Sequence, residues 1–323
     1  MAITLADAAQ NVQDDIDLRV IDEFRKSSWL MDNLSFDPVV NPAGGGSTLT
    51  YGYTRLVSER GASFRPLNSE YSTEQAKRSR STVDLSVLGG AFEIDRVLSN
   101  LGPAATNEIA FQMAQTVKSA NAFFSDQIIN GTRNTSTATG FEGLSKILTG
   151  SSTEFKTAAD WSTPADQAAA HNALDSIDEF LGLLDDTPSA LLGNKKTIAR
   201  IRSLARRAGY YSRTENSFGQ TVEAYNGIPF IDLGAKAGTS TPVIGIDGKT
   251  GATDLYAVRL GLDAFHGVST VGGGLVRQWL PDFSTAGAVK RGEVELGPVA
   301  VVLKATKAAA VWRGIKVQPT AAA

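Results

Sequence analysis

Residues Tyr51 to Thr82 read YGYTRLVSERGASFRPLNSEYSTEQAKRSRST, a long polar and charged stretch inside an otherwise apolar chain. Between Leu67 and Val83 this stretch contains no aliphatic side chain larger than that of alanine. It cannot bury enough apolar surface to offset the conformational entropy that is lost when a chain becomes ordered. Its order therefore has to come from contacts outside the stretch itself.

Strand-like segments flank this stretch on both sides. Apolar and polar side chains alternate at Leu49, Tyr51 and Tyr53 on the way out and at Val83, Leu85 and Val87 on the way back. This period of two predicts a long two-stranded arm that projects from a domain. Because an isolated two-stranded arm is marginally stable in water, we expect another chain to stabilise it. The pattern favours assembly over catalysis.

Composition limits the classes of function that need to be considered. The chain has 323 residues, enough for two domains or one large domain with excursions, and its formal net charge of −3 gives no argument for nucleic-acid binding. It has no cysteine and two histidines, so we expect no disulfide, no zinc site and no cofactor, although a calcium site at carboxylates stays open. The first residues lack a signal-peptide pattern, and no apolar run approaches the roughly 20 residues of a membrane helix.

Charge is distributed unevenly along the chain. Residues 1–40 hold eight acidic and three basic residues, whereas residues 55–80 hold six basic and three acidic ones. One interpretation is two solvated segments; the other is that arms of different subunits attract each other. The candidate contacts between subunits are the basic residues Arg55, Arg60, Arg65, Lys77, Arg78 and Arg80 and the acidic residues Asp14, Asp15, Asp17, Asp22 and Glu23.

Periodicity predicts a mixed α+β protein with segregated helices and strands. We expect amphipathic helices over residues 4–27, about 24 residues ending at Asn130, 164–184 and 195–208. Residues 131–163 are predicted to form a loop with short elements, and residues 209–221 a loop. Strands are expected at residues 189–192, around residue 243, and over 255–259, 275–280, 294–304 and 309–317, and a hairpin is expected over 222–233.

Motifs for catalysis or ligand binding are weak. His171 and His266 favour packing or surface positions over a catalytic triad, which needs a geometry that sequence does not supply. Residues 244–250 end in Gly-Lys-Thr but lack the first glycine of a phosphate loop, and Gly272–Gly274 lacks the setting of a dinucleotide site. The helix over 195–208 has one basic face. We favour a solvated or subunit-pairing role for this face, with DNA contact as the alternative.

Three segments carry a resemblance to a known family: IDEFRKSSWL (residues 21–30), LLGNKKTI (residues 191–198) and YNGIPF (residues 225–230). With the order of the predicted elements, they resemble the Hong Kong 97 fold of tailed-phage major capsid proteins. The resemblance implies an N-terminal arm over residues 1–46, an extended loop (a β-hairpin) over 47–99 and a peripheral domain with a spine helix over 100–165. An axial domain over 166–272 and a return to the peripheral domain over 273–323 follow.

The resemblance implies a structural protein rather than an enzyme. Such a protein forms hexamers and pentamers of an icosahedral phage head around double-stranded DNA, and it is assembled in the cytoplasm of the bacterial host. The implied partners are other copies of the chain, a separate scaffolding protein, a portal, decoration proteins and weakly bound DNA. Lys77 is the only lysine in the loop and no asparagine follows Asn226, so we expect no covalent cross-links. An encapsulin-type bacterial compartment shell is the alternative, and an enzyme of unknown class is a third.

Overall fold

The computed structural model describes residues 29–40, 49–71, 75–99, 103–163, 166–208, 212–215, 221–270 and 276–319. The helix predicted over residues 4–27 lies outside the described residues, and so does the glycine run at residues 272–274. The acidic candidate contacts Asp14, Asp15, Asp17, Asp22 and Glu23 lie outside them as well.

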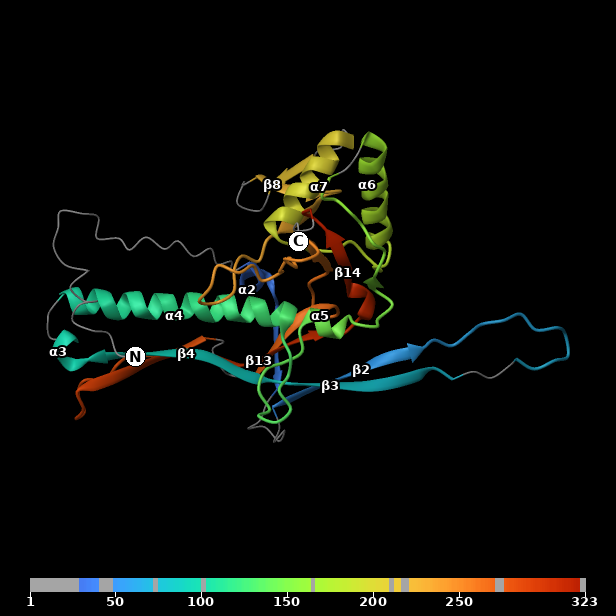
Figure 1. The fold of residues 1–323 in the computed structure, drawn as a ribbon. Coiled ribbons are helices and arrows are strands. Elements are labelled where there is room, and N and C mark those ends of the chain that lie inside the picture. The colour runs from blue at the N-terminus through green and yellow to red at the C-terminus, as the bar shows by residue number, and fades with distance from the viewer. Residues whose placement is uncertain are drawn as a thin grey trace.

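The described elements form two sheets, a long helix and a projecting hairpin (Figure 1). The helices are α2 (Trp29–Asn33), α3 (Arg96–Ser99), α4 (Pro103–Asn130), α5 (Leu144–Ile147), α6 (Gln167–Leu181), α7 (Lys195–Ala208) and the 3₁₀ turn η1 (Thr306–Ala308). The strands are β1 (Phe36–Val40), β2 (Thr50–Ser58), β3 (Lys77–Asp84), β4 (Ser86–Asp95), β5 (Glu154–Phe155), β6 (Ala190–Leu192), β7 (Ser212–Glu215), β8 (Thr221–Tyr225), β9 (Ile228–Ile231), β10 (Ala252–Val258), β11 (Phe265–Thr270), β12 (Val276–Trp279), β13 (Val289–Leu303) and β14 (Ala309–Lys316). The predicted α+β class is confirmed.

The first body is a five-stranded sheet centred on β13. This strand pairs antiparallel with β4 along one side, over residues 289–299, and along its other side with β12 over 293–296 and β11 over 299–303. β1 extends the sheet by parallel pairing with β11. Phe92 of β4 and Val294 of β13 pack against Met113 of α4, so the helix covers this part of the sheet. Gly292 makes room for the ring, because a Cβ there would lie 2.4 Å from Phe92.

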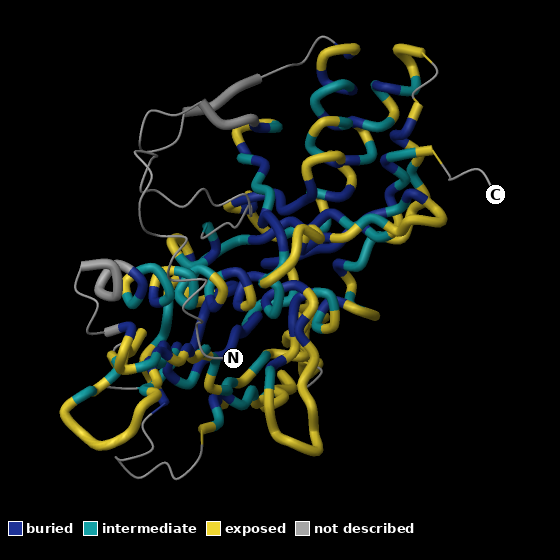
Figure 2. Tube along the Cα trace, turned by 60° about the vertical axis from the view of Figure 1, so that its left-hand side comes forward, coloured by how far each residue is buried: buried dark blue, intermediate teal, exposed yellow. Residues whose placement is uncertain are grey.

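The second body is a seven-stranded sheet in the order β5-β14-β10-β6-β9-β8-β7. Its central strands bury both faces, as expected for strands covered on two sides. Leu255 and Ala257 of β10 pack in one cluster with α6 and α7, whereas Tyr256 and Val258 join the cluster that contains Phe124 of α4. Figure 2 shows the buried residues concentrated in the middle of the molecule and the exposed ones along its outer loops. The molecule is therefore layered, with the helix pair on one face of this sheet and α4 towards the other.

Helix α4 is 28 residues long, about 42 Å at 1.5 Å per residue. Pro103 occupies its first position, where the missing N–H costs nothing. The predicted apolar stripe is confirmed, because Ala120, Phe124 and Ile128 are buried. At its end Gly131 approaches the Gln127 carbonyl oxygen so closely that a Cβ would lie 2.3 Å away, and glycine is required.

Strands β2 and β3 form a two-stranded hairpin that leaves the body on the opposite side from most of α4 (Figure 1). The register places Tyr51 opposite Val83 and Tyr53 opposite Ser81. From residue 54 outward nearly every residue is exposed, apart from Arg55. The predicted two-stranded arm is confirmed; its stabilisation by another chain stays a prediction.

Three strands lie in a different sheet from the rest of the segment to which the sequence analysis assigned them. β4, within the predicted extended loop, pairs along β13 in the five-stranded sheet. β11, within the predicted axial segment, belongs to the same sheet. β14, within the predicted peripheral return, lies between β5 and β10 in the seven-stranded sheet. All three pairings join residues far apart in the sequence, which local periodicity does not reveal.

Local predictions held where the chain turns tightly. Asn226 and Gly227 have φ angles of 50° and 82°, and this left-handed pair connects β8 to β9 as the Asn-Gly signal predicts.

Two predictions were wrong: residues 212–215, taken as loop, form β7 against β8, and no strand forms around residue 243. Strand β11 was missed because its sequence, FHGVST, lacks a clear alternation of apolar and polar residues.

Candidate assembly interface

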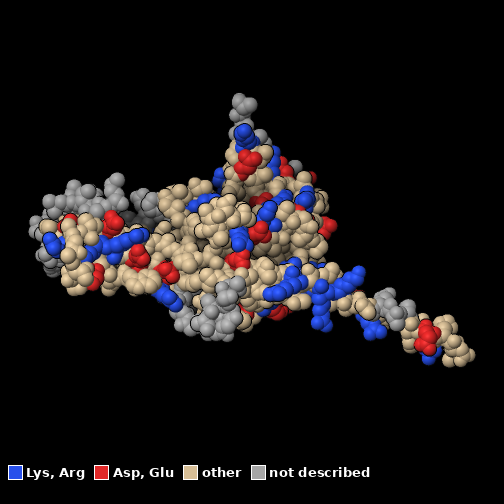
Figure 3. All heavy atoms as spheres, turned by 90° about the horizontal axis from the view of Figure 1, so that it is seen from below, with Lys and Arg blue, Asp and Glu red and all other residues tan. Residues whose placement is uncertain are grey.

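The basic residues of the hairpin lie where the sequence analysis placed them, on an arm outside the folded body. Figure 3 shows Lys and Arg side chains gathered along the stem of the hairpin. Lys77, Arg78 and Arg80 are exposed on β3, and Arg60 and Arg65 are exposed in the connecting segment. The stem therefore offers a positive surface to whatever lies beside it.

Arg55 serves its own chain, although the sequence analysis took it as a contact between subunits. Its Nε donates to the carbonyl oxygen of Lys304 at 2.8 Å, and its Nη2 donates to the carbonyl oxygen of Leu303. The Tyr53 hydroxyl donates to that same Leu303 oxygen at 3.3 Å. These bonds fix the root of the hairpin to the end of β13. The side chain is half-buried there, so its charge reinforces backbone hydrogen bonds.

Replacing Arg55 by alanine should loosen the root of the hairpin. We expect amide hydrogen exchange in β2 and β3 to become about tenfold faster, because two charge-assisted hydrogen bonds to the body are lost. Exchange measured by mass spectrometry on the unassembled chain tests this. Thr54→Ala, at the neighbouring exposed position, is the control and should leave exchange near the wild-type rate. Equal rates in both variants would contradict the anchoring role of Arg55.

The outer part of the hairpin has local structure of its own. The Arg65 guanidinium lies 5.3 Å from the centre of the Tyr71 ring, and its Nη1 donates to the Ser69 carbonyl oxygen at 2.9 Å. The neighbouring Phe64 is fully exposed and Leu67 is 91% exposed. An ordered turn thus presents two large apolar side chains to solvent, at the end farthest from the body. Two apolar side chains held together in solvent would gain free energy if a partner covered them.

The basic face of α7 is partly used within the chain. Arg200 donates from Nε to the Val317 carbonyl oxygen at 2.9 Å, and Lys196 contacts the Gln318 side chain. Lys195 and Arg206 are exposed on the outer side of the helix. The face therefore anchors the C-terminal segment with some of its cations and leaves others at the surface. A subunit-pairing role and DNA contact both stay predictions.

The geometry of the histidines favours packing. His171 is half-buried on α6, whereas His266 is fully buried on β11 in the other body. Asp263, which a triad with His266 would need, pairs with Arg259 at 3.0 Å instead. Within the described ranges no three His, Asp or Glu side chains cluster closely enough to hold a metal ion.

The Gly-Lys-Thr segment forms a turn closed by its own carboxylate. Asp247 accepts hydrogen bonds from the Lys249 N–H at 2.8 Å and the Thr250 hydroxyl at 2.7 Å. These bonds, the Lys249 N–H foremost, lower the pKa of Asp247. An anion already occupies the donors that a phosphate would use. This turn geometry agrees with the sequence analysis, in which residues 244–250 lack the first glycine of a phosphate loop.

A second charged cluster, which the sequence analysis missed, links β14, β5, β10 and α5 at Arg313 of β14. Its guanidinium contacts Glu154 of β5 at 3.2 Å and Asp254 of β10 at 2.8 Å, and it donates to the Ser145 hydroxyl of α5 at 2.9 Å. A lone arginine inside the apolar run AAAVWRGIKV was the available signal. A charge in a buried strand requires partners. The cluster is structural, since each acid already has its cation.

No described helix is both long and apolar enough to cross a lipid bilayer. Comparison with protein-family models finds no match. Comparison with curated proteins finds none either.

Solved structures do match, over nearly the whole chain. An encapsulin, in the holo-SrpI complex from Synechococcus elongatus PCC 7942, is 15% identical with a TM-score of 0.58, and the match covers 100% of this chain and 99% of that one. The capsid of Myoviridae phage XM1 is 13% identical with a TM-score of 0.57, covering 97% and 99% of the two chains. A chain of Mycobacterium phage Bobi is 13% identical with a TM-score of 0.57, covering 96% and 98%.

The chain has the Hong Kong 97-like capsid fold. The resemblance read from the sequence is confirmed at the level of the fold. In the terms of this fold, β2 and β3 form the extended loop and α4 is the spine helix. The predicted bounds of the peripheral and axial domains stay predictions.

Proposed function

We propose that the chain is the major capsid protein of a tailed bacteriophage. It self-assembles into hexamers and pentamers of an icosahedral head that encloses double-stranded DNA, and it acts as a structural protein rather than an enzyme. The observation that carries the proposal is the projecting hairpin with its exposed apolar end, on a fold shared end to end with phage capsid chains. A hairpin this long gains stability only by lying on a neighbour.

A ring of identical chains needs a heterologous contact, in which one surface meets a different surface of the next copy. The hairpin and the body supply two such surfaces on one chain. Copies arranged head to tail would each cover a neighbour's hairpin, and the ring closes without leaving an arm in water. The acidic N-terminal segment and the basic hairpin carry opposite charge, which would help to set the register of neighbouring copies.

The proposal includes partners and a location. A separate scaffolding protein, a portal and decoration proteins would act with the shell during assembly in the cytoplasm of the bacterial host, and the finished protein would reside in the virion. DNA contact would be weak and non-specific, through exposed cations such as Lys195 and Arg206.

An encapsulin-type compartment shell is the second candidate, favoured by the match to the Synechococcus encapsulin over the full length of both chains. The two candidates differ in what the shell contains. Electron microscopy of the purified protein, paired with ultraviolet absorbance, separates them: closed particles with nuclease-protected DNA support a phage head, and closed particles with a co-purifying protein support a compartment. A chain that stays monomeric, with or without a scaffolding protein, would refute both.

Reversing two hairpin charges, Arg60→Glu with Arg65→Glu, should weaken assembly and leave the fold of the monomer intact. The charge reversal, together with the loss of the Arg65 contacts with Tyr71 and Ser69 that order the turn, predicts a rise of about tenfold in the protein concentration at half-assembly. Light scattering gives this concentration, and circular dichroism checks the monomer. The control reverses two exposed lysines away from the hairpin, Lys146→Glu with Lys249→Glu. Normal shells from the hairpin variant would argue against an electrostatic role of the loop.

A further inference from the structure

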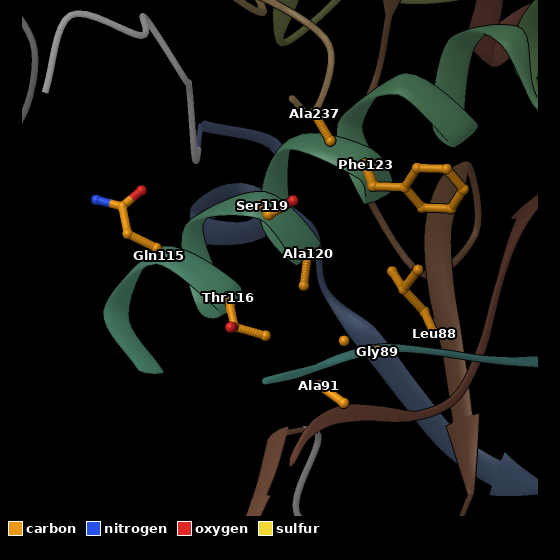
Figure 4. A pocket seen from close by; sticks show the side chains of 10 residues that line it. Leu88, Gly89, Ala91, Gln115, Thr116, Ser119, Ala120, Phe123 and Ala237 are labelled. Carbon is orange, nitrogen blue, oxygen red and sulfur yellow. The ribbon is translucent and has the colours of Figure 1, made fainter. Parts of the chain in front are cut away.

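A cavity of about 400 Å³ opens between the middle of α4 and the strand β4 (Figure 4). Leu88 and Phe123 lie at the same end of it, and Thr116 and Ser119 supply its hydroxyl groups. None of the described residues that line the cavity is ionisable, so it holds no acid, base or charged side chain for a reaction. A pair of residues that can react with each other lies elsewhere, in the turn between β8 and β9.

Asparagine followed by glycine is the sequence in which side chain and backbone react most readily with each other. The backbone nitrogen of the following residue can attack the side-chain carbonyl carbon, and glycine has no side chain to obstruct that attack. The chain contains two such pairs, Asn130-Gly131 at the end of α4 and Asn226-Gly227 between β8 and β9. The two pairs are alike in sequence, so a difference in their reactivity has to come from the fold.

The pair Asn130-Gly131 is held on both sides of the bond that would form. The Asn130 Nδ2 donates to the Asp126 carboxylate at 2.7 Å and to the Val243 carbonyl oxygen at 2.8 Å, which uses both donors of the amide. Gly131 is buried, and its N–H donates to the Gln127 carbonyl oxygen at 2.9 Å. The nitrogen and the carbon cannot meet without breaking these bonds, so we expect this pair to be inert.

The pair Asn226-Gly227 is open by comparison. Both residues are exposed, and a Cβ at Gly227 would meet nothing within 4 Å. Among the described residues, neither the Asn226 side-chain amide nor the Gly227 N–H has a hydrogen-bond partner. The pairing of β8 with β9 ends at Tyr225 and Ile228, so the two residues lie beyond the last pair of the ladder. The peptide group between them can therefore turn while that pairing stays intact.

The geometry of the turn brings the two groups within reach of each other. Positive φ angles at both Asn226 and Gly227 define a type I′ turn. Rotation of the peptide group between them gives a type II′ turn, in which ψ of the first residue is about −120° and φ of the second is negative. Glycine accepts either sign of φ, so Gly227 permits this rotation. At that ψ the Gly227 nitrogen lies on the side of the backbone that carries the Asn226 side chain.

We propose that Asn226 is a site of spontaneous deamidation by attack of the Gly227 nitrogen on the Asn226 side chain. A bond forms between the Gly227 nitrogen and the Asn226 Cγ, and the bond from Cγ to Nδ2 breaks. Ammonia leaves with the proton of the Gly227 N–H, and water then opens the cyclic imide to aspartate or isoaspartate. This inference is independent of the proposed assembly.

The two products differ in their effect on the turn. Aspartate tolerates a left-handed backbone, so it fits the turn and adds only a negative charge. Isoaspartate lengthens the backbone by one atom and does not fit a two-residue hairpin connection. The modification at Asn226 therefore loosens the end of the β8–β9 hairpin in the chains that carry isoaspartate.

Peptide mapping by mass spectrometry, after incubation of the folded natural chain at pH 8, tests the proposal. We expect Asn226 to deamidate at least about tenfold faster than Asn130, because only Asn130 has to break hydrogen bonds first. In the chain unfolded by urea the two rates should become equal, since both residues precede glycine. Equal rates in the folded chain would overturn the inference. So would an Asn226 that reacts in the unfolded chain and not in the folded one.

A variant confirms the position of the reaction. Asn226→Gly keeps the preference for positive φ, as in Gly-Gly hairpin turns, and removes the amide. The mass gain should then disappear from the tryptic peptide over residues 214–236, which also contains Asn216. A gain that persists in this variant would place the reaction at Asn216 and refute the proposal.

Discussion

Replacing Arg313 by leucine is expected to lower the free energy of unfolding by about 3 kcal/mol or more. The arginine neutralises Glu154 and Asp254, and it donates to the Ser145 carbonyl oxygen at 2.6 Å. The Glu154 side chain is only 6% exposed, so its carboxylate would be left in a poorly solvated place with Lys156 as the remaining cation. Removing one partner from such a pair costs far more than the pair itself contributes.

The same cluster predicts a dependence of stability on acid pH. Hydrogen bonds from the Gly150 N–H, Lys156 and Arg313 lower the pKa of Glu154 to about 2, from an ordinary value near 4.5. The folded state therefore favours the carboxylate. The resulting stabilisation is complete above pH 4.5 and is lost as the pH falls towards 2. In the Arg313→Leu variant this loss on acidification should be smaller, because one of the groups that lowers the pKa is absent.

Urea unfolding of the unassembled chain at pH 7 and pH 3 measures both effects. Arg291→Leu is the matched control, since Arg291 forms an exposed pair with Glu293 at 3.1 Å. Exposed pairs contribute little, so this variant should stay within about 0.5 kcal/mol of the natural chain. Equal losses at the two positions would show that the Arg313 cluster has no special structural role.

The position of Arg313 also bears on assembly. The cluster links α5, which follows the long helix, to β5, β10 and β14 of the seven-stranded sheet. Force on the hairpin would be transmitted to the body through the hydrogen bonds of Tyr53 and Arg55 to the end of β13. In the sequence of elements, only η1 lies between β13 and β14. Directional contacts of a planar guanidinium resist shear better than apolar packing does, because they fix orientation as well as distance. The cluster is suited to hold α5 in one orientation on the seven-stranded sheet.

The sequence was sufficient to predict elements whose signals are local. Helix α7 runs from Lys195 to Ala208 as predicted, and its start is fixed by Asn194, whose side chain accepts from the Thr197 N–H at 2.9 Å. The hairpin was predictable for a similar reason, since two alternating strands bracket a stretch too polar to fold. Cap residues and periods of two or 3.6 are properties of adjacent residues, and one sequence suffices to read them.

Sheet membership and the roles of single side chains were not predictable in this way. The run AAVW at the start of β14 indicates a strand buried on both faces, but it does not say which sheet receives the strand. Arg55 and Arg65 look alike in the sequence, yet one anchors the hairpin root to Leu303 and the other braces the turn beside Phe64. What separates them is which distant backbone lies within reach, and that depends on the completed fold.

Acidification from pH 7 to pH 5 is expected to destabilise the body beneath the hairpin root through His266. The imidazole is fully buried, and neither ring nitrogen has a hydrogen-bond partner among the described residues. Its ring meets the Tyr51 ring edge-on at 6.2 Å, and the Lys304 Nζ lies 5.6 Å from the Tyr51 ring centre. Burial, and next the Lys304 charge, lower the pKa of His266, while Asp37, the Ala264 backbone and Asp263 act in the opposite direction.

The sign follows from the two protonation states. The folded chain binds a proton at His266 less readily than the unfolded chain, whose imidazole takes up a proton below about pH 6.5. The free energy of unfolding therefore falls with decreasing pH, by at most about 1.4 kcal/mol per pH unit for this one group.

His266→Phe keeps the ring contact with Tyr51 and removes the titration, so its stability should change less between pH 7 and pH 5. Urea unfolding at the two pH values and hydrogen exchange in β2 measure the difference. The variant His171→Phe retains His266 and with it the pH dependence of the natural chain. If His266→Phe loses as much stability on acidification as the natural chain does, protonation of His266 is not the cause, and the hairpin root is insensitive to this histidine.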